Sequence, residues 1–504
     1  MVTRNQGRKA SSQDIVSVLI EPDPKTYNQA MKSVKHVEWK EAADAELASM
    51  EENRTWTIVP RTNDIKALHT KWVFKRKTDA NGNLERFKAR MVACGNKQVL
   101  GVNYDMTVAA VMDLGTAKLI LALARIWGMP ARHGDGPNAY VKAPTEKNLD
   151  LYLHVPQGMK ISTSKLDELG VTSRDQVVLR LQKSLYGLKQ AGRLWSHLLH
   201  EKLSDAGFKQ SLTDSCLYYD QDTIGITVLG SFNRPVSKFL GMRVRYNDED
   251  GYYLDQEPSI CELMTKMGMD EAHPVLTPIG QDYSDSTTSN SEYLEIRLVK
   301  KATTLAGSLL WIARCTRPDI SFAMHKLTRR THAPTTADWA SGVRVVKYLK
   351  GTKSLKLYLG GEVCTNSREV TLEAFSDADY AADDETRKSI SGTAFTLNGM
   401  TISWSCKKQH SVALSTMEAE FVAASKTSQE LLGAKKLFSE LKAKVKEPMI
   451  LWMDNQAAIS QSLNEATSIK AEHIDVRLKF VRANMVRKII APRYVHTSKM
   501  MADL

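Results

Sequence analysis

The C-terminal third of the chain has the clearest folding pattern. From about Glu369, apolar residues alternate as in strands, then recur at helical spacing, and then alternate again. This order of elements is typical of an α/β domain with its own core. Strands are expected over 369–377, 390–397, 400–406, 449–453 and 488–495, and helices over 416–442, 455–463 and 473–485, with another helix beginning at 499.

Two aspartates of this region lie where apolar strands end. Asp377 follows VTLEAFS, and Asp454 follows MILWM and precedes a helix. Carboxylates presented from separate elements suit a two-metal site, because Mg²⁺ prefers oxygen ligands. A solvated surface group or the N-cap of the next helix is the plainer alternative. Position alone leaves both interpretations open.

Two glutamates lie at the start of the helix expected over 416–442. Ser415 and Glu418 fit the capping-box pattern S-x-x-E, which gives Glu418 a structural role. Glu420 lies nearly opposite Glu418 on the helix, and it is therefore the better candidate for chemistry. Asp503 comes last, at the head of the helix expected from 499.

A strand pair is expected early in the chain, where KWVFKRK and LERFKARMVA flank the turn DANGN. On its second strand Arg86, Lys88 and Arg90 alternate with apolar residues, so the three cations share one face. Such a face can hold a triphosphate or a template backbone. A solvated basic edge strand is the alternative.

Other elements are expected around this strand pair. The spacing over 27–53 predicts a helix with Ala30, Val34, Val37, Ala42 and Leu47 on one side. The segment 114–128 predicts a buried helix, DLYLHVP a strand, and the stretch from SLYGLKQ a long amphipathic helix. A polar Ser/Thr-rich linker over 279–293 precedes further helices that end near YLKGT.

Composition indicates the partner and the compartment. A chain of 504 residues is expected to form two to four domains, and its net charge of +12 favours nucleic acid as partner. Six cysteines without a CxxC pair indicate neither disulfides nor a zinc module, which suits an intracellular location, cytoplasmic or nuclear. No apolar run predicts a membrane span or a secretion signal, and residues 1–26 are expected to form a disordered basic tail.

Four stretches carry a resemblance to a known domain: FSDADYAADDETRKSISG, SWSCKKQHSVALSTMEAEFVAAS, LWMDNQAAI and HIDVRLKFVR. In this order they resemble the ribonuclease H domain of copia-type LTR-retrotransposon polyproteins. The resemblance implies cleavage of the RNA strand of an RNA–DNA hybrid with two Mg²⁺ ions, or Mn²⁺ in their place. Its catalytic and metal-binding acids fall on Asp377, Glu420, Asp454 and Asp503, with Glu418 as the alternative to Glu420.

One departure from that family concerns Asp503. Copia-type chains continue past the ADxxTK motif, whereas this sequence stops at Met-Ala-Asp-Leu. Little helix is then expected to fix the position of Asp503. Histidines such as His410, His473 and His496 could tune the site, although isolated histidines are more often structural.

The segment from about 27 to 360 resembles the reverse transcriptase of the same family. The resemblance lies in WKEAADAELASMEENRTW, KWVFKRKTDANGNLERFKARMVACGNKQ, SLYGLKQAGRLW, FLGMRV, TRPDISFA and VKYLKGT. It implies contacts to nucleotide or nucleic acid at Lys75, Arg86, Lys88, Arg90, Tyr140, Gly187 and Gln190. Within HGDGPNAYV it makes Asp135 a catalytic metal ligand, although Gly136 and Pro137 follow where a strand should continue.

The second half of that polymerase site is missing. In the family, the strand after SCLYYD leads into tyrosine-x-Asp-Asp, which supplies the other two metal-binding carboxylates. Here residues 226–229 enter the strand and VSKFLG resumes shortly after, with no YxDD motif, so a deletion is inferred near 230–238. Asp135 alone cannot hold two Mg²⁺ ions. The polymerase is therefore expected to be inactive.

The sequence thus predicts an α+β or α/β multidomain protein. Residues 27–278 are expected to form polymerase-like fingers with an incomplete palm, 279–365 a linker and helical connection, and 366–504 a ribonuclease H-like α/β domain. The expected partners are an RNA–DNA hybrid, an RNA template and DNA, with no membrane, and the oligomeric state is not indicated. The alternatives are a non-catalytic nucleic-acid-binding remnant and a product without function, from a decayed element or a wrong gene model.

Overall fold

The structure, a computed structural model, describes residues 22–78, 84–132, 134, 136–221, 225–231, 241–280, 291–361, 369–463 and 472–503. The chain forms two compact units of mixed helix and sheet. The first comprises Met1–Ala110 and Gly136–Ala206, and the second Val111–Asp135 and Gly207–Leu504. These units group an early helix with the C-terminal half, while the domain boundaries expected near 26, 278 and 365 stay predictions.

The first unit has its core between one helix, α3 (His36–Glu52), and the antiparallel pair β2 (Thr70–Thr78) and β3 (Leu84–Ala93). Trp39 of α3 meets Phe74 and Phe87 edge-on, with ring centroids 5.4 and 4.5 Å apart. Aromatic pairs favour this geometry, so the contact fixes the helix on the sheet. The buried face of α3 recurs about once per helical turn, at Trp39, Ala43, Leu47 and Met50.

The continuous helix predicted over 27–53 is wrong, because the chain breaks between α2 (Tyr27–Lys32) and α3. Ser33 is extended, and its N–H donates to the carbonyl of Ala30 and closes the first helix. Because of the break, the residues of α3 do not continue the buried face of α2 at helical spacing. Val34 and Val37, which were expected on the apolar side, are 80% and 52% exposed.

A three-stranded antiparallel sheet completes the first unit, in the order β1-β5-β4. The strand predicted in DLYLHVP is confirmed only over two residues of β4, and the long helix begins at Ala191. The remaining elements are β1 (Trp56–Pro60), η1 (Gly95–Lys97), α5 (Ala139–Lys142), β4 (Tyr152–Leu153), α6 (Thr163–Glu168), η2 (Arg174–Gln176), β5 (Val177–Leu181) and α7 (Ala191–Asp205).

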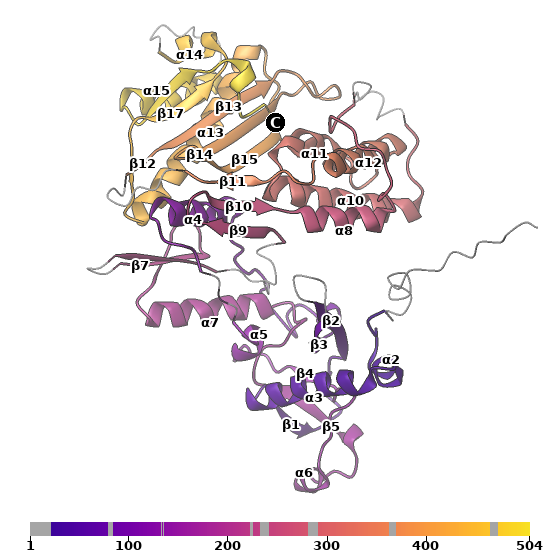
Figure 1. Ribbon diagram of the computed structural model, residues 1–504. Helices are drawn as coiled ribbons and strands as arrows, with labels where there is room; N and C mark the ends of the chain where they lie inside the picture. Colours follow the sequence, from indigo (N-terminus) through magenta and orange to yellow (C-terminus); the bar gives the residue numbers. More distant parts are fainter. Residues whose placement is uncertain are drawn as a thin grey trace, which may run out of the picture. The chain divides into compact units, whose positions relative to one another are not determined.

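A five-stranded sheet dominates the second unit, in the order β15-β14-β13-β17-β18 (Figure 1). Neighbours from β15 to β13 are antiparallel, whereas β13, β17 and β18 are parallel. The long helix α13 packs on β13, where Ala419 and Ala423 meet Ala378 in a buried cluster. Small side chains let helix and strand approach closely. The strands are β13 (Leu372–Asp379), β14 (Ile390–Leu397), β15 (Met400–Lys408), β17 (Met449–Met453) and β18 (Ile490–Tyr494).

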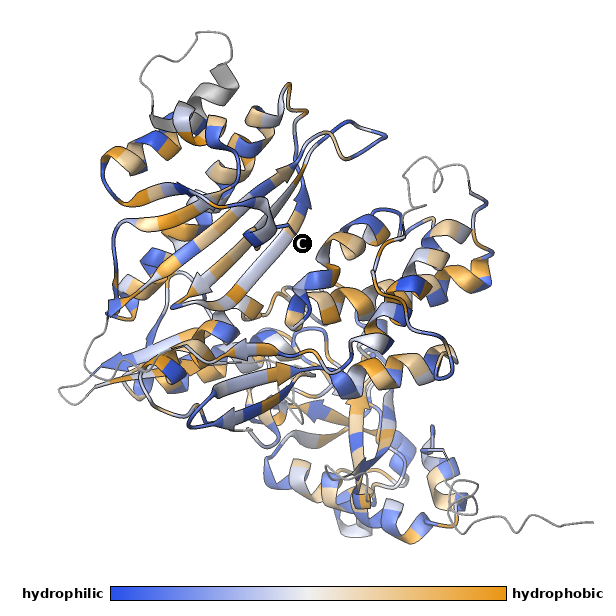
Figure 2. Ribbon diagram, turned by 45° about the horizontal axis from the view of Figure 1, so that its top comes forward, coloured by the Kyte–Doolittle hydropathy of each residue, from blue (hydrophilic) through white to orange (hydrophobic). Residues whose placement is uncertain are grey.

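The order of strands and helices predicted for residues 369–495 is confirmed. Both hydrophobic and hydrophilic residues lie along these strands and helices (Figure 2). The helix expected from 499 is wrong within the described residues. The chain there makes three-residue turns, in which Met500 N donates to Thr497 O and Asp503 N to Met500 O. The other elements are β12 (Glu369–Val370), α13 (Thr416–Glu440), β16 (Lys444–Val445), α14 (Gln456–Leu463), α15 (Glu472–Val486) and η4 (Thr497–Lys499).

Elements from before residue 366 are built into the second unit. The helix expected over 114–128 is confirmed as the buried α4 (Leu114–Ile126), which packs on β15. Lys118 of α4 lies 3.4 Å above the Trp404 ring, and Trp404 Nε1 donates to the carbonyl of Ala313 at 3.0 Å. Glu440, at the end of α13, accepts hydrogen bonds from the loop that follows the short strand β6 (Lys209–Gln210). The five-stranded sheet and α13 therefore make contacts with segments from earlier in the chain.

Helices and two small sheets make up the rest of the second unit. A helical cluster built from α8, α10, α11 and α12 has its own buried core. The strands form two three-stranded sheets, β6-β7-β8 and β11-β10-β9. The bounds are β6 (Lys209–Gln210), β7 (Leu217–Gln221), β8 (Ile226–Gly230), β9 (Arg243–Asn247), β10 (Gly251–Asp255), α8 (Glu257–Met267), α10 (Ile296–Cys315), η3 (Pro318–Ile320), α11 (Ser321–Thr328), α12 (Thr336–Gly351) and β11 (Leu357–Leu359).

Among the helices that the structure describes, none combines the length and the apolar character that crossing a membrane requires.

Candidate functional site

Three carboxylates meet at one edge of the five-stranded sheet. The parallel register pairs Phe375 of β13 with Trp452 of β17. Asp377 and Asp454 each follow two residues later, so both lie at the same level at the carboxyl ends of neighbouring strands. Glu420 reaches them from the first turns of α13. One oxygen from each of Asp377, Glu420 and Asp454 lies within 4.8 Å of the other two.

Burial and mutual repulsion govern the charge of this three-carboxylate group. Glu420 is only 5% exposed, and its Oε2 has no hydrogen-bond partner among the described residues. Burial, with Asp377 and Asp454 nearby, raises the pKa of Glu420 to about 8. Burial and the charges of Asp454 and Asp503 raise the pKa of Asp377 to about 6. Three carboxylates repel one another here, and among the described residues one buried oxygen has no hydrogen-bond partner. Carboxylate oxygens in this arrangement fit a hard divalent cation such as Mg²⁺.

Asp503 lies close to this group without joining it. Its charge contributes to the raised pKa of both Asp377 and Asp379, but its oxygens are not among those within 4.8 Å of one another. The segment that carries it is held against the sheet, because Ala502 is buried and its carbonyl lies where a side chain at Gly392 would be. The packing of Ala502 therefore keeps Asp503 near the site.

Glu418 has the structural role that the capping pattern predicted. Ser415 Oγ accepts a hydrogen bond from Glu418 N at 3.1 Å, and Glu418 Oε2 accepts one from Leu414 N at 2.6 Å. The carboxylate therefore binds the loop before α13 rather than the cap residue itself. Glu418 does not belong to the three-carboxylate group.

The structure adds one contact to the site that the sequence analysis missed. Thr497 Oγ1 donates to Asp454 Oδ2 at 3.0 Å. Of the histidines considered, His496 caps the short η4 turn through Ser498, and the side chain of His473 lies outside the described residues.

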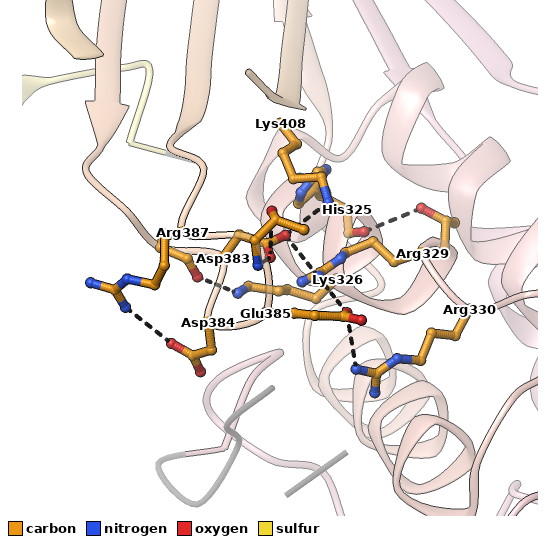
Figure 3. A network of polar contacts seen from close by, with 12 residues as sticks. His325, Lys326, Arg329, Arg330, Asp383, Asp384, Glu385, Arg387 and Lys408 are labelled. Atoms are coloured by element: carbon orange, nitrogen blue, oxygen red, sulfur yellow. Dashed lines mark hydrogen bonds and ion pairs between the residues drawn. The ribbon is translucent and has the colours of Figure 1, made fainter. Parts of the chain in front are cut away.

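A buried ion-pair network lies in the turn between β13 and β14. The Asp383 side chain is fully buried, and Arg329 and Lys408 reach its Oδ2 at 2.7 and 3.0 Å (Figure 3). Thr386 donates to its other oxygen through both N and Oγ1. Burial acts to raise the pKa of Asp383, but these hydrogen bonds and cations hold it well below its usual range. The network ties the end of α11 to the turn beyond Asp377 and Asp379.

The cations predicted in the first unit do share one face of the strand pair β2–β3. Lys75 pairs directly with Lys88 across the strands, Lys77 pairs with Arg86, and Ala89 and Met91 point into the core. Like charges opposite one another are unfavourable. Burial and the charges of Arg90 and Arg86 lower the pKa of Lys88. Within the described part of the chain, no carboxylate lies at ion-pair distance from Lys75, Arg86, Lys88 or Arg90, although the charge of Glu46 acts on Lys88 and Arg90 from farther away. The basic strand pair keeps an excess of positive charge, which suits an anion.

Tyr140, Gly187 and Gln190 lie in the same unit as the basic strand pair. Tyr140 meets Tyr186 edge-on at 5.1 Å, and the Arg90 guanidinium lies 5.1 Å from the centre of the Tyr186 ring. Gly187 has φ +91° and no room for a Cβ beside Ala93. Gln190 is fully buried, and its amide donates to Asn103 O at 3.0 Å and accepts from Gln98 at 3.0 Å. These bonds tie the buried Gln190 side chain to Gln98 and Asn103, and its predicted contact with nucleic acid stays a prediction.

Two parts of the predicted polymerase site lie outside the described residues. They are Asp135 and the chain over 232–240, where the YxDD motif was found to be missing. The strand that enters this gap, β8, pairs antiparallel with β7. It packs against Met112 and Ile120, which leave no room for a side chain at Gly230.

One segment of the chain matches a known protein family. Residues 53–232 match the family model described as reverse transcriptase (RNA-dependent DNA polymerase). The chain therefore contains a segment of the reverse transcriptase family.

The relatives along nearly the whole chain are retrovirus-related Pol polyproteins of plant transposons. That of transposon TNT 1-94 from Nicotiana tabacum is 28% identical over 99% of this chain and 39% of its own length. That of transposon RE1 from Arabidopsis thaliana is 29% identical over 97% of this chain and 34% of its own length. Along nearly its whole length the chain is similar to these retrotransposon Pol polyproteins, and it spans between a third and two fifths of their length.

One solved structure matches along most of the chain. It is a foamy viral protease-reverse transcriptase in complex with double-stranded DNA, 12% identical, which covers 93% of this chain and 71% of that one. Its TM-score of 0.42 is too low to establish a shared fold.

The raised pKa of Glu420 predicts a pH-dependent stability in the absence of metal. The folded chain keeps this proton up to about pH 8, whereas the unfolded chain releases it near its ordinary value of 4.5. The unfolded state therefore binds fewer protons between these values, and the free energy of unfolding falls as pH rises through this window. Urea denaturation in EDTA at pH 5 and pH 8 is expected to show this loss.

Replacing Glu420 by Gln removes the titrating group, so the loss between pH 5 and pH 8 should shrink by about 2–4 kcal/mol. Glu418→Gln is the matched control and is expected to keep the parent's pH dependence. Equal losses in the parent and in Glu420→Gln would contradict the assignment.

Proposed function

We propose that the segment 366–504 is a copia-type ribonuclease H domain that cleaves the RNA strand of an RNA–DNA hybrid. The observation that carries the proposal is the three-carboxylate group of Asp377, Glu420 and Asp454, in which one buried glutamate oxygen has no hydrogen-bond partner among the residues that the structure describes. The motifs around these residues and the strand and helix order of the segment also support it.

The three carboxylates would hold the metal, and the charge of Asp503 acts on the same site. Held by these residues, Mg²⁺ would supply an activated water and charge stabilisation for the leaving oxygen of the phosphodiester. The protein holds Asp377 and Asp454 near the ends of paired strands and Glu420 on a packed helix. The fold therefore fixes the positions of these carboxylates without a bound metal. Burial of Glu420 excludes water from one side of the site.

The nuclease proposal is tested by substrate choice. The full chain with Mg²⁺ is incubated with three labelled substrates of one sequence: an RNA–DNA hybrid, double-stranded RNA and double-stranded DNA. Cleavage of the RNA strand of the hybrid, with neither homoduplex cut, is the expected result. Equal cleavage of the hybrid and of double-stranded RNA would contradict the assignment.

We further propose that the polymerase site is inactive. The sequence has no YxDD motif, and Asp135 by itself cannot bind two ions. The alignment with the TNT 1-94 polyprotein extends over 536 positions, more than the 504 residues of this chain, so that relative has residues with no counterpart here. This agrees with the deletion inferred near 230–238.

Template-primed incorporation of labelled nucleotide is therefore expected to stay at the level of a blank without enzyme. A competent reverse transcriptase assayed in parallel controls for template and primer. Incorporation above the blank that depends on this chain would show that the site is intact.

A second candidate function is nucleic-acid binding without turnover. The basic strand pair favours it, because its cations have no carboxylate at ion-pair distance among the described residues. Such binding would weaken steeply with salt, since phosphate contacts release counterions. Hybrid binding without cleavage in Mg²⁺ would favour this candidate over the nuclease.

A further inference from the structure

The chain that follows β18 runs beside the chain that follows β17. The parallel register pairs Met453 with Tyr494, and Val495 N continues the ladder by donating to Met453 O at 2.9 Å. Asp454 follows Met453 directly, and Thr497 lies two residues beyond Val495. The sheet therefore brings the Thr497 hydroxyl to the Asp454 carboxylate.

The turn that carries Thr497 is held by local bonds that do not use its side chain. His496 Nδ1 accepts from Ser498 N at 3.2 Å, and Lys499 N donates to the carbonyl of His496 at 2.8 Å. Met500 N donates to the Thr497 carbonyl, and the Met500 side chain is buried. The Thr497 hydroxyl is thus placed by its backbone and is left to bind another group.

That group is Asp454, whose Oδ2 accepts from Thr497 Oγ1 at 3.0 Å. A carboxylate at the end of a strand can rotate about its own bonds, and a hydroxyl donor on one oxygen restricts that rotation. Hydrogen bonds to metal-binding carboxylates orient them, and their removal costs about 10–100-fold in metal affinity.

We propose that Thr497 is a positioning residue for Asp454, and that its hydroxyl sets the affinity of the three-carboxylate group for a divalent cation. This inference rests on the proposed metal centre. Thr497 is exposed, so its methyl group contributes little packing, and its effect is on the carboxylate rather than on the fold.

The test measures metal binding in the absence of nucleic acid. Mn²⁺ is titrated into the metal-free full chain, and the free ion is followed by electron paramagnetic resonance. Thr497→Val, which keeps the shape and removes the hydroxyl, is expected to weaken Mn²⁺ binding about tenfold. Thr497→Ser keeps the hydroxyl and is expected to bind within twofold of the parent. Unchanged binding in Thr497→Val, or equal weakening in Thr497→Ser, overturns the inference.

Hybrid cleavage supplies a second measurement. Thr497→Val should need about tenfold more Mg²⁺ for half-maximal cleavage, with the parent's kcat restored at saturating Mg²⁺. If the parent binds Mn²⁺ no better than Asp454→Asn, the metal centre itself is wrong and the inference falls with it. If the parent binds Mn²⁺ and cleaves hybrid while Thr497→Val matches it, only the role of Thr497 is wrong.

Discussion

Glu420→Gln is expected to lower the rate of hybrid cleavage at least about a hundredfold. The glutamine loses a negative oxygen ligand at the buried side of the three-carboxylate group, where no described residue makes a hydrogen bond to the Oε2 of Glu420. Metal ions in such sites supply several kcal/mol of charge stabilisation to the transition state, and about 1.4 kcal/mol corresponds to each factor of ten. The rate is measured on a labelled hybrid at fixed Mg²⁺.

Glu418→Gln provides the matched comparison two residues away on the same helix. Glu418 binds the backbone of Leu414, and an amide oxygen can still accept that hydrogen bond. Its cleavage rate is expected to stay within a few-fold of the parent. If Glu418→Gln loses more activity than Glu420→Gln, the two glutamates have been assigned the wrong way round.

Asp383→Asn is expected to destabilise the β13–β14 region by about 3–5 kcal/mol. The substitution leaves Arg329 and Lys408 directed at a neutral, fully buried amide. Removing one partner of a buried ion pair is costly, because the remaining charges lose their compensation. Hydrogen exchange of peptides that cover 372–408, followed by mass spectrometry, reports this local loss of stability.

Asp384→Asn is the control at the neighbouring position. The Asp384 side chain is 50% exposed and lies 3.9 Å from Arg387. A surface change of this kind is expected to alter stability by no more than about 0.5 kcal/mol. Equal hydrogen exchange in Asp383→Asn and Asp384→Asn would show that the buried network contributes nothing to the stability of this region.

Local patterns in the sequence indicate where the three carboxylates lie, but their expected role in binding metal came from the resemblance to the ribonuclease H domain and stays a prediction. Asp377 lies near the end of β13, and Asp454 follows β17 directly. Glu420 lies two residues after Glu418 on α13, so the two side chains lie on different faces of the helix. The parallel pairing of β13 with β17, which sets the two aspartates at one level, appears only in the structure.

Contacts between distant segments could not be predicted from these patterns. The pairing of β17 with β18 brings Thr497 to Asp454. Arg329, at the end of α11, forms an ion pair with Asp383, which lies in a different part of the sequence. The spacing of apolar residues did not indicate that Ser33 ends the first helix. Val34 and Val37 were therefore predicted on a buried face, whereas both are exposed in the structure.

The most direct test of the metal centre is the rate at which the full chain cleaves the RNA strand of a labelled RNA–DNA hybrid in Mg²⁺, compared with Asp454→Asn. The account predicts cleavage by the parent that EDTA abolishes, and a loss of at least about a hundredfold in the variant. Equal rates in the parent and in Asp454→Asn, or no cleavage by a folded parent at saturating Mg²⁺, would contradict it.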